Sequence, residues 1–232
     1  MKELMPNGKK PISTIIEECY TLPDRFSVLE CGAFSVEYLE TENWVGKQNV
    51  WLIEPLEEGC KDLRKITSQV IQTCLTDYTG DVEFTVNTSE AGHSTIEYHP
   101  EHWEILKQLS LDKTHSQSAR CIDYKTLQDN LSVVFDILVL DIEEHESTVL
   151  KSMLPLDPVY LPKVFCIECG YDWSKKKEVL NKLGYQIDFY SFNNCYLSRP
   201  SDSFVPKKEE TQAMNEANRA FIYGGRLIYD NP

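Results

Sequence analysis

A run of ionisable side chains near the middle of the chain has the composition of a reactive or ligand-binding site: Asp141, Glu143, Glu144, His145 and Glu146. Carboxylates and imidazoles this close together can accept protons, bind a cation or hold a metal ion. The four residues before them, 137–140, are apolar and typical of a strand buried on both faces. Val149, Leu150 and Met153 then recur at helical spacing. Open α/β sheets bind ligands where a buried parallel strand ends and a helix follows, so we expect the functional site here.

Two more acids stand at the ends of predicted strands. Glu30 lies in an apolar segment, 26–31, directly before the turn Gly32-Ala33, and Gly32 would let a ligand approach the backbone closely. Glu54 ends a second strand roughly 20 residues after that turn, where a carboxylate commonly accepts hydrogen bonds from ribose hydroxyls. Glu54 therefore predicts a nucleoside-containing cofactor. The alternative is an exposed acid that caps the following helix.

Strand and helix patterns alternate along the chain and would position these acids. Strands are predicted at 26–31, 48–55, 137–141 and 164–168, and helices at 12–22, 32–45, 57–66, 124–131, 174–183 and 207–220. Repeated strand–helix units with right-handed crossovers predict an α/β fold with a doubly wound, mostly parallel sheet. Segments 186–190 and 195–198 predict a C-terminal antiparallel hairpin.

The region between these units is less regular. Residues 70–76 and 82–86 predict two strands around a turn, and 120–122 predicts a short third strand. Segment 87–116 carries four of the five histidines, at positions 93, 99, 102 and 115. We expect it to form an active-site cover loop with a helical turn near 101–109.

Composition limits the classes of protein and partner. The 232 residues, 41% of them apolar, predict one domain over 1–232, with a lead-in helix within 1–25, a core over 26–199 and a polar extension over 200–232. The net charge of −14 argues against a nucleic-acid partner. The basic triplet 175–177 is interpreted as the solvated first turn of a helix.

Cysteine usage and the absence of targeting signals indicate the compartment. Eight cysteines are scattered, and only Cys166 and Cys169 have C-x-x-C spacing, with no second pair nearby to complete a zinc site. No metal ligands are assigned. The N-terminus lacks the apolar core of a signal peptide, and no segment reaches transmembrane length. We expect a cytoplasmic protein with no membrane partner.

Four short motifs together resemble the FkbM-type methyltransferases. They are Glu30-Cys-Gly-Ala33, Ile53-Glu-Pro55, the stretch 138–146 and the stretch 164–168, in the family's order and spacing over about residues 26 to 198. The resemblance implies a Rossmann-like class I methyltransferase fold with S-adenosylmethionine (SAM) as cofactor. It also implies O-methylation of a hydroxyl on a small molecule or glycan. Phe34 stands where the family usually has Asn, and Glu144 where it has Gly.

The resemblance also assigns roles around the cofactor. Glu30, Gly32, Ala33 and Phe34 would surround the methionine end of SAM, with Phe34 narrowing that space. Glu54 would bind the ribose and Asp141 would lie beside the transferred methyl group. Cys74 and Leu75 would lie near the adenine, although core packing accounts equally well for both.

An oxygen nucleophile must also lose its proton, ideally to a group with a pKa near neutrality. His145 and His93 are candidates, and Glu143 and Glu168 are alternatives if burial raises their pKa. His145 facing solvent, and glutamates that only complement the dipole of the following helix, are the competing interpretations. A divalent ion held by Asp141, Glu168 and a histidine is conceivable but not expected, because no spacing is metal-specific.

Two other functions stay open. The same fold could carry a different enzyme chemistry, or the chain could be a catalytically silent methyltransferase-like module that binds partners. Phe34 and the polar, acidic C-terminal extension motivate the second possibility.

Overall fold

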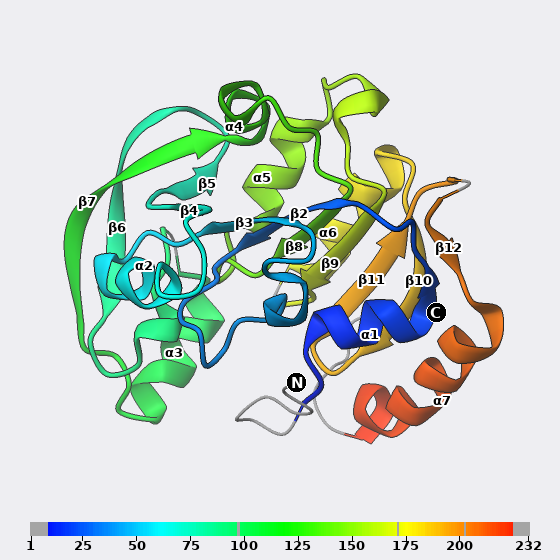
Figure 1. Ribbon diagram of the computed structural model, residues 1–232. Helices are drawn as coiled ribbons and strands as arrows, with labels where there is room; N and C mark the ends of the chain where they lie inside the picture. The colour runs from blue at the N-terminus through cyan, green and yellow to red at the C-terminus, as the bar shows by residue number, and fades with distance from the viewer. Residues whose placement is uncertain (1–8, 97, 171, 202, 225–232) are drawn as a thin grey trace.

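The computed structural model describes residues 9–96, 98–170, 172–201 and 203–224, built around a seven-stranded sheet (Figure 1). In spatial order its strands are β10 (Gln186–Ser191), β11 (Asn194–Ser198), β9 (Val164–Glu168), β8 (Ile137–Leu140), β2 (Ser27–Cys31), β3 (Asn49–Ile53) and β4 (Val70–Ile71). The five strands from β9 to β4 are parallel, and β11 pairs antiparallel with both β9 and β10. The predicted α/β fold with a mostly parallel sheet is therefore confirmed.

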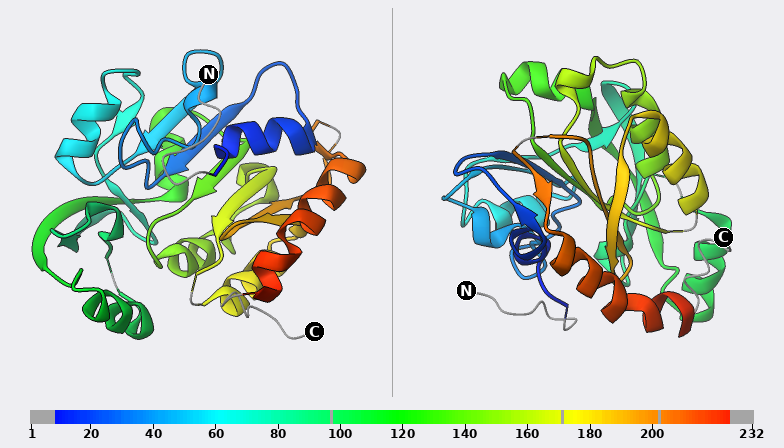
Figure 2. Two further views of the ribbon diagram at one scale, coloured as in Figure 1. Left: turned by 90° about the horizontal axis from the view of Figure 1, so that it is seen from below. Right: turned by 90° about the vertical axis from the view of Figure 1, so that its right-hand side faces the viewer.

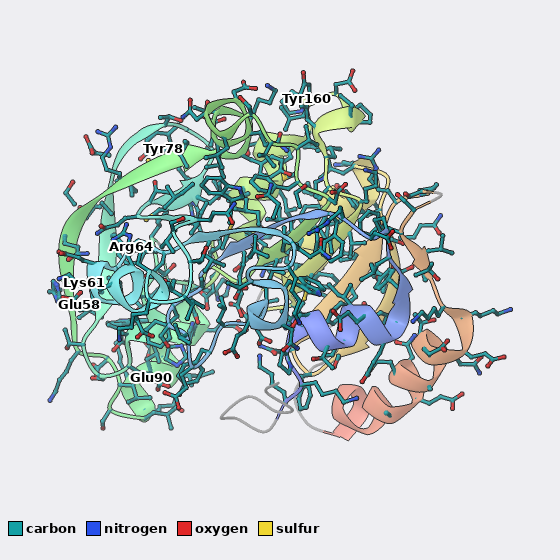
Figure 3. All side chains as sticks on the ribbon, in the orientation of Figure 1. Glu58, Lys61, Arg64, Tyr78, Glu90 and Tyr160 are labelled. Carbon is teal, nitrogen blue, oxygen red and sulfur yellow. The ribbon has the colours of Figure 1, made fainter. Side chains whose placement is uncertain are left out.

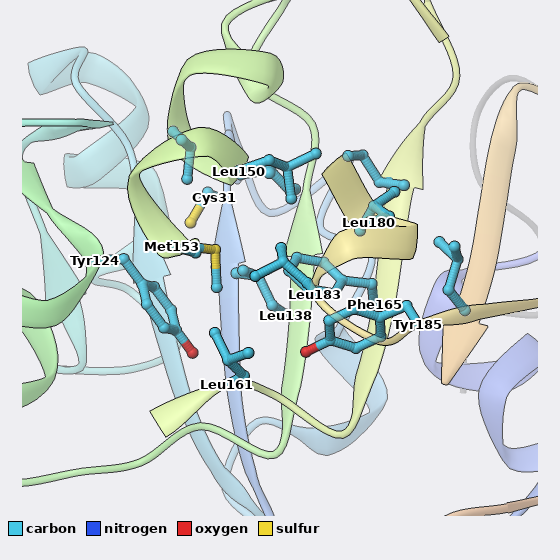
Figure 4. Packing of buried hydrophobic residues seen from close by; sticks show 14 of the residues in the cluster. Cys31, Tyr124, Leu138, Leu150, Met153, Leu161, Phe165, Leu180, Leu183 and Tyr185 are labelled. Carbon is cyan, nitrogen blue, oxygen red and sulfur yellow. The ribbon is translucent and has the colours of Figure 1, made fainter. Parts of the chain in front are cut away.

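Both faces of the sheet are covered by helices (Figure 2). One face packs against α4 (Tyr124–Leu131), α5 (Glu146–Met153) and α6 (Trp173–Lys182); the other packs against α1 (Ile12–Cys19), α2 (Glu57–Leu63) and α7 (Lys208–Gly224). Successive residues of β8 alternate between the faces: Leu138 joins the first core cluster and Val139 the second. Figure 4 shows Leu138 and Phe165 packed beneath Leu150 and Met153 of α5. Each such fully buried side chain contributes about 1.5–3 kcal/mol.

A three-stranded sheet lies beyond β4. It consists of β5 (Cys74–Thr76), β7 (Thr114–Asp123) and β6 (Gly80–Asn87), and β6 and β7 form the long curved ribbon on the left of Figure 1. The segment between the ribbon strands holds a 3₁₀ turn, η2 (Ala91–His93), and α3 (Pro100–Gln108). The predictions here were partly wrong, because 70–76 splits between two sheets and β7 is far longer than 120–122. Pairing with all of β6 stabilises the polar residues of β7, which local propensity alone does not favour.

The predicted helix 32–45 is absent from the structure, where a single 3₁₀ turn, η1 (Glu42–Trp44), takes its place. Gly32 and Phe34 have positive φ angles of 81° and 52°, which a helix cannot contain. The buried carboxylate of Glu30 then accepts hydrogen bonds from the backbone of the returning loop. This long-range contact satisfies backbone groups that a helix would have paired internally.

The remaining elements lie at the periphery. β1 (Tyr20–Thr21) pairs antiparallel with β12 (Val205–Pro206), and η3 (Pro158–Tyr160) precedes β9. Phe204 is buried and belongs to the same core cluster as the buried residues of α1. α7 runs beside α1 and β10 (Figures 1 and 2). Residues 225–232 of the predicted extension lie outside the described residues. Within the described chain, no helix has both the length and the apolar character required to cross a bilayer.

The strand order creates the crevice that positions the site. From β2 the chain moves outward to β3 and β4, then crosses to β8 on the other side of β2. Connections therefore leave the carboxyl ends of β2 and β8 in opposite directions. An open α/β sheet binds its ligand at such a reversal point.

We predict that Gly32→Ala destabilises the protein by at least about 2 kcal/mol. An added Cβ would lie 1.7 Å from the carbonyl oxygen of Asp141, and the positive φ of Gly32 disfavours any side chain. Urea unfolding measures the change. Gly46→Ala is the matched control, because Gly46 also has a positive φ but open space around its Cβ position. Equal losses in the two variants would contradict a role for the Gly32–Asp141 contact.

Candidate functional site

A cavity of about 590 Å³ opens at the carboxyl ends of β2, β3 and β8. Its size lies within the range of small-molecule and cofactor sites. Most of the residues predicted from the sequence line it: Glu30, Gly32, Phe34, Glu54, Cys74, Leu75, His93, Asp141, Glu143 and His145. Ala33 and Glu168 do not line it; Ala33 is buried in the core beneath the turn. The carboxyl ends of three predicted strands thus lie at the same cavity.

Glu30 supports the turn at the edge of the cavity. Its carboxylate accepts hydrogen bonds from the backbone N–H groups of Glu40 and Thr41, both at 3.0 Å, and from the Thr41 hydroxyl at 2.5 Å. The residue is only 2% exposed. Burial raises the pKa of Glu30 to about 8, although these hydrogen bonds oppose the shift.

Glu54 lies between the first turn and the start of α2. One oxygen accepts a hydrogen bond from the N–H of Phe34 at 3.0 Å, and the other accepts one from the N–H of Leu56 at 2.7 Å. Burial raises the pKa of Glu54 to about 7. Each carboxylate oxygen carries two lone pairs, so each can accept one more hydrogen bond from the cavity. The alternative interpretation of Glu54 as an exposed acid is wrong, because it is only 3% exposed.

Phe34 forms a wall of the cavity and leaves its interior open. Its backbone has a φ of 52°, the left-handed region in which Asn is tolerated far better than an aromatic residue. Its ring lies 5.7 Å from that of Tyr38, centroid to centroid. The Phe34 and Tyr38 rings therefore give this part of the cavity wall an aromatic surface.

The loop after β8 carries the densest group of acids. Burial, followed by the charge of Glu143, raises the pKa of Asp141 to about 7. Glu143 and Glu144 have φ angles of 54° and 80°, a conformation that favours glycine. Thr95 holds this loop by donating its hydroxyl to the carbonyl oxygen of Glu143.

Glu146 also holds the loop after β8 in place. Its Oε1 accepts hydrogen bonds from the N–H groups of Ile142 at 2.9 Å and Glu144 at 3.3 Å. Its Oε2 lies 2.8 Å from Nζ of Lys176, and neither side chain is exposed. The interpretation of the basic triplet as a solvated turn is therefore wrong for Lys176, which is fully buried.

His145 is buried and not solvent-facing, which overturns the competing interpretation made from the sequence. It precedes α5 and is 8% exposed, and its Nε2 lies 2.8 Å from the hydroxyl oxygen of Thr76. Thr76 belongs to β5, which covers the His145 ring. The sequence did not predict this burial, because it did not indicate that β5 belongs to the second, three-stranded sheet. His145 is nevertheless among the residues that line the cavity.

Glu168 lies behind the cavity wall at the end of β9. It accepts a hydrogen bond from Asn193 at 2.7 Å and forms a cluster of carboxylates with Asp141 and Glu146. Removal from water and the nearby charge of Asp141 raise its pKa well above the usual range. Glu168 is thus close to the predicted site without facing its interior.

Two residues in or beside the cavity were missed by the sequence analysis. Lys9 is the one lysine or arginine among the described residues that line the cavity, and its Nζ lies 3.1 Å from Glu40. His102, on α3, forms a close group with His93 and Glu143, and this carboxylate raises the pKa of His93. Neither Lys9 nor His102 stands in a local pattern that predicts a site, because long-range packing brings both to the cavity.

Comparisons with known proteins agree with the motifs. The family model described as the methyltransferase FkbM domain matches residues 10–193. A comparison with curated protein sequences gave no match. 

Two solved structures are similar to this chain. Methyltransferase FkbM from Methylobacillus flagellatus KT has 16% identity and a TM-score of 0.48, over 75% of this chain and 44% of that chain. Precorrin-6y C5,15-methyltransferase from Geobacter metallireducens GS-15 has 12% identity and a TM-score of 0.41, over 90% of this chain and 92% of that chain. The chain thus spans less than half the length of the first of these proteins.

We predict that Glu30 makes the folded state less stable as the pH rises. Its pKa is raised from 4.5 to about 8 in the folded protein, so over this range the folded state binds more protons than the unfolded state. Its contribution is fully present below the unfolded pKa and is lost as the pH passes the folded pKa. With rising pH, the unfolding free energy of Glu30→Gln should fall less steeply than that of wild type, by up to about 1.4 kcal/mol per pH unit.

Urea unfolding between about pH 5 and pH 8 measures this dependence. Glu58→Gln, at an exposed position of α2 labelled in Figure 3, is the matched control. The same pH dependence in Glu30→Gln and wild type would rule out the raised pKa.

Proposed function

This chain belongs to the FkbM family of methyltransferases, and we propose that it transfers a methyl group from SAM to a hydroxyl of a small molecule or glycan. The observation that carries the proposal is the meeting of Glu30, Glu54 and Asp141, from three different strand ends, at one cavity. The family match covers most of the chain and supports the methyltransferase class.

The described residues fit this cofactor in size and charge. The cavity of about 590 Å³ is within the range of cofactor sites. Besides Glu30, Glu54 and Asp141, its walls carry four further carboxylates: Glu37, Glu40, Glu90 and Glu143. A strongly acidic, partly desolvated space stabilises a cation, and SAM carries a sulfonium and an ammonium group.

Individual residues have distinct proposed roles. Glu54 would bind the ribose hydroxyls, and Gly32 would let the cofactor approach the turn closely. Cys74 and Leu75 would contact the adenine. Lys9, beside Glu40 and close enough to Asp141 for that charge to raise its pKa, would face the carboxylate of the methionine end.

When bound, SAM supplies an activated methyl group on a positively charged sulfur. The chain must orient the acceptor oxygen in line with that methyl group, exclude water and take up the hydroxyl proton. Asp141 is the leading proton acceptor, because burial brings its pKa to about 7. His145, His93 and Glu143 line the same cavity and are the further candidates. Glu168 would act through Asp141, which it neighbours.

The competing proposal is a catalytically silent binding module. Phe34 motivates it, because an aromatic side chain stands on the cavity wall where the family usually has Asn. A folded protein that gives no calorimetric heat with either SAM or S-adenosylhomocysteine would favour the silent module. A different chemistry on the same fold would be favoured by binding of another ligand.

We predict that Glu54→Gln weakens binding of S-adenosylhomocysteine by about tenfold, because one ribose hydrogen bond is lost. Isothermal titration calorimetry measures the affinity, and a thermal melt checks that the variant is folded. Glu58→Gln, the same change at an exposed position of α2, should bind as wild type does. Unchanged affinity in Glu54→Gln would refute the ribose role.

We predict that Asp141→Asn lowers methyl transfer by at least about 100-fold while the protein stays folded. The loss follows from removal of a proton acceptor with a pKa of about 7. The assay follows formation of S-adenosylhomocysteine with a panel of hydroxylated small molecules and glycans. If Asp141→Asn unfolds the chain and has no separate effect on turnover, Asp141 is structural.

A further inference from the structure

Three side chains of types that can bind a metal ion gather at the rim of the cavity: His93 of η2 and Glu143 of the loop after β8, which line it, and His102 of α3 beside them. One donor atom of each lies within 4.8 Å of the donor atoms of the other two. The two imidazole rings meet edge to face, with centroids 5.3 Å apart. Because these residues come from separate segments, their meeting is a product of the tertiary structure.

The spacing within this cluster suits a shared ion better than a direct hydrogen bond. Nδ1 of His93 lies 3.5 Å from Oε2 of Glu143, which is longer than a normal hydrogen bond. This Nδ1 is buried and has no hydrogen-bond partner among the described residues. Two ligand atoms about 2.0–2.1 Å from a tetrahedral zinc ion lie about 3.4 Å apart. The observed separation matches that value.

Further contacts hold the three ligands in place. The hydroxyl of Tyr98 donates to the carbonyl oxygen of His93, and the hydroxyl of Thr95 donates to that of Glu143, both at 2.5 Å. Oε1 of Glu144 lies 2.5 Å from Nδ1 of His102. In metal sites a carboxylate commonly orients a ligating histidine through one ring nitrogen in this way.

We propose that His93, His102 and Glu143 bind a divalent first-row transition metal of the class of Zn²⁺. Two imidazoles and one carboxylate suit such ions, whereas Mg²⁺ and Ca²⁺ prefer oxygen ligands alone. Three protein ligands leave at least one coordination position open, as in catalytic zinc sites. His93 and Glu143 both line the cavity, so an ion held by them would be accessible to a cavity ligand.

A second cluster, formed by Asp141, Glu146 and Glu168, is less suited to a metal ion. Glu146 already pairs with the ammonium of Lys176 at 2.8 Å, so a cation is present there. A metal at that position would have to displace or oppose this fully buried charge. The histidine-containing cluster therefore carries the proposal.

The role of the ion rests on the proposed function of the cavity. A hydroxyl bound to the ion would have a lowered pKa, so its O–H bond would break and the proton would pass to a cavity carboxylate outside the ligand set, such as Asp141. The oxygen would then form a bond to the methyl carbon of SAM as the carbon–sulfur bond breaks, and the electron pair of that bond would stay on sulfur. The ion would thus select acceptors that present a hydroxyl at this rim.

Titration of the tag-free, metal-free full chain with Co²⁺ and Zn²⁺ tests the site. Visible absorption of Co²⁺ reports coordination, and calorimetry with Zn²⁺ reports affinity. We expect one equivalent to bind, and His93→Ala, His102→Ala and Glu143→Gln each to lose at least about 100-fold in affinity. His115→Ala removes an exposed histidine of β7 outside the cluster and should bind as wild type does.

Two further measurements keep the test decisive. If a histidine variant fails to fold in a thermal melt, Glu143→Gln and Glu144→Gln decide, the latter with an expected loss of about 10–100-fold. The inference is overturned if wild type binds neither ion, or if the folded variants bind as wild type does. Titration of the metal-free chain with S-adenosylhomocysteine separates the two proposals. Cofactor binding without metal binding ends only the metal site, whereas metal binding without cofactor binding ends only the proposed function.

Discussion

The buried ion pair between Glu146 and Lys176 is the interaction on which the site depends. Glu146 also accepts two backbone N–H groups from the loop after β8, so one side chain fixes the path of that loop. Removing water from both charges is costly, and such pairs contribute little net stability. Either charge left alone in this unexposed position would be strongly destabilising, so Glu146 and Lys176 require one another. The pair therefore ties α6 to the loop that carries Asp141, Glu143 and Glu144.

The backbone of the loop that Glu146 helps to fix is strained. Two consecutive glutamates take positive φ angles, each costing about 1–3 kcal/mol. The hydrogen bond from Thr95 and the contacts of Glu144 with His102 help to offset that strain. This conformation directs the side chains of successive loop residues to different surroundings. Asp141 and Glu143 line the cavity. Glu144 instead accepts a hydrogen bond from the backbone N–H of His99, in the segment before β7.

Carboxylates in the cavity are held in two different ways. Glu30 and Glu54 accept backbone N–H groups and so support the turn after β2 and the start of α2. Burial raises the pKa of all three acids, but the next largest influence on the pKa of Asp141 is the charge of Glu143, whereas for Glu30 and Glu54 it is hydrogen bonding. The first two would shape the space that a cofactor occupies, while Asp141 is better placed to exchange a proton. A bound cation would relieve the repulsion among these acids, which is a physical reason for SAM as the proposed ligand.

The sequence by itself determined the parallel core and the strand ends that carry Glu30, Glu54 and Asp141. Runs of buried residues such as 137–140 depend on local pattern, and parallel strands align their carboxyl ends at one edge. Only the tertiary structure decided what covers that edge. The burial of His145 by β5, the full burial of Lys176 and the meeting of His102 with His93 all depend on contacts between distant segments. The missing helix after β2 has the same cause, because Glu30 binds the backbone of a loop ten residues away. Local propensity cannot encode such contacts, since their free energy arises only when the remote partner is in place.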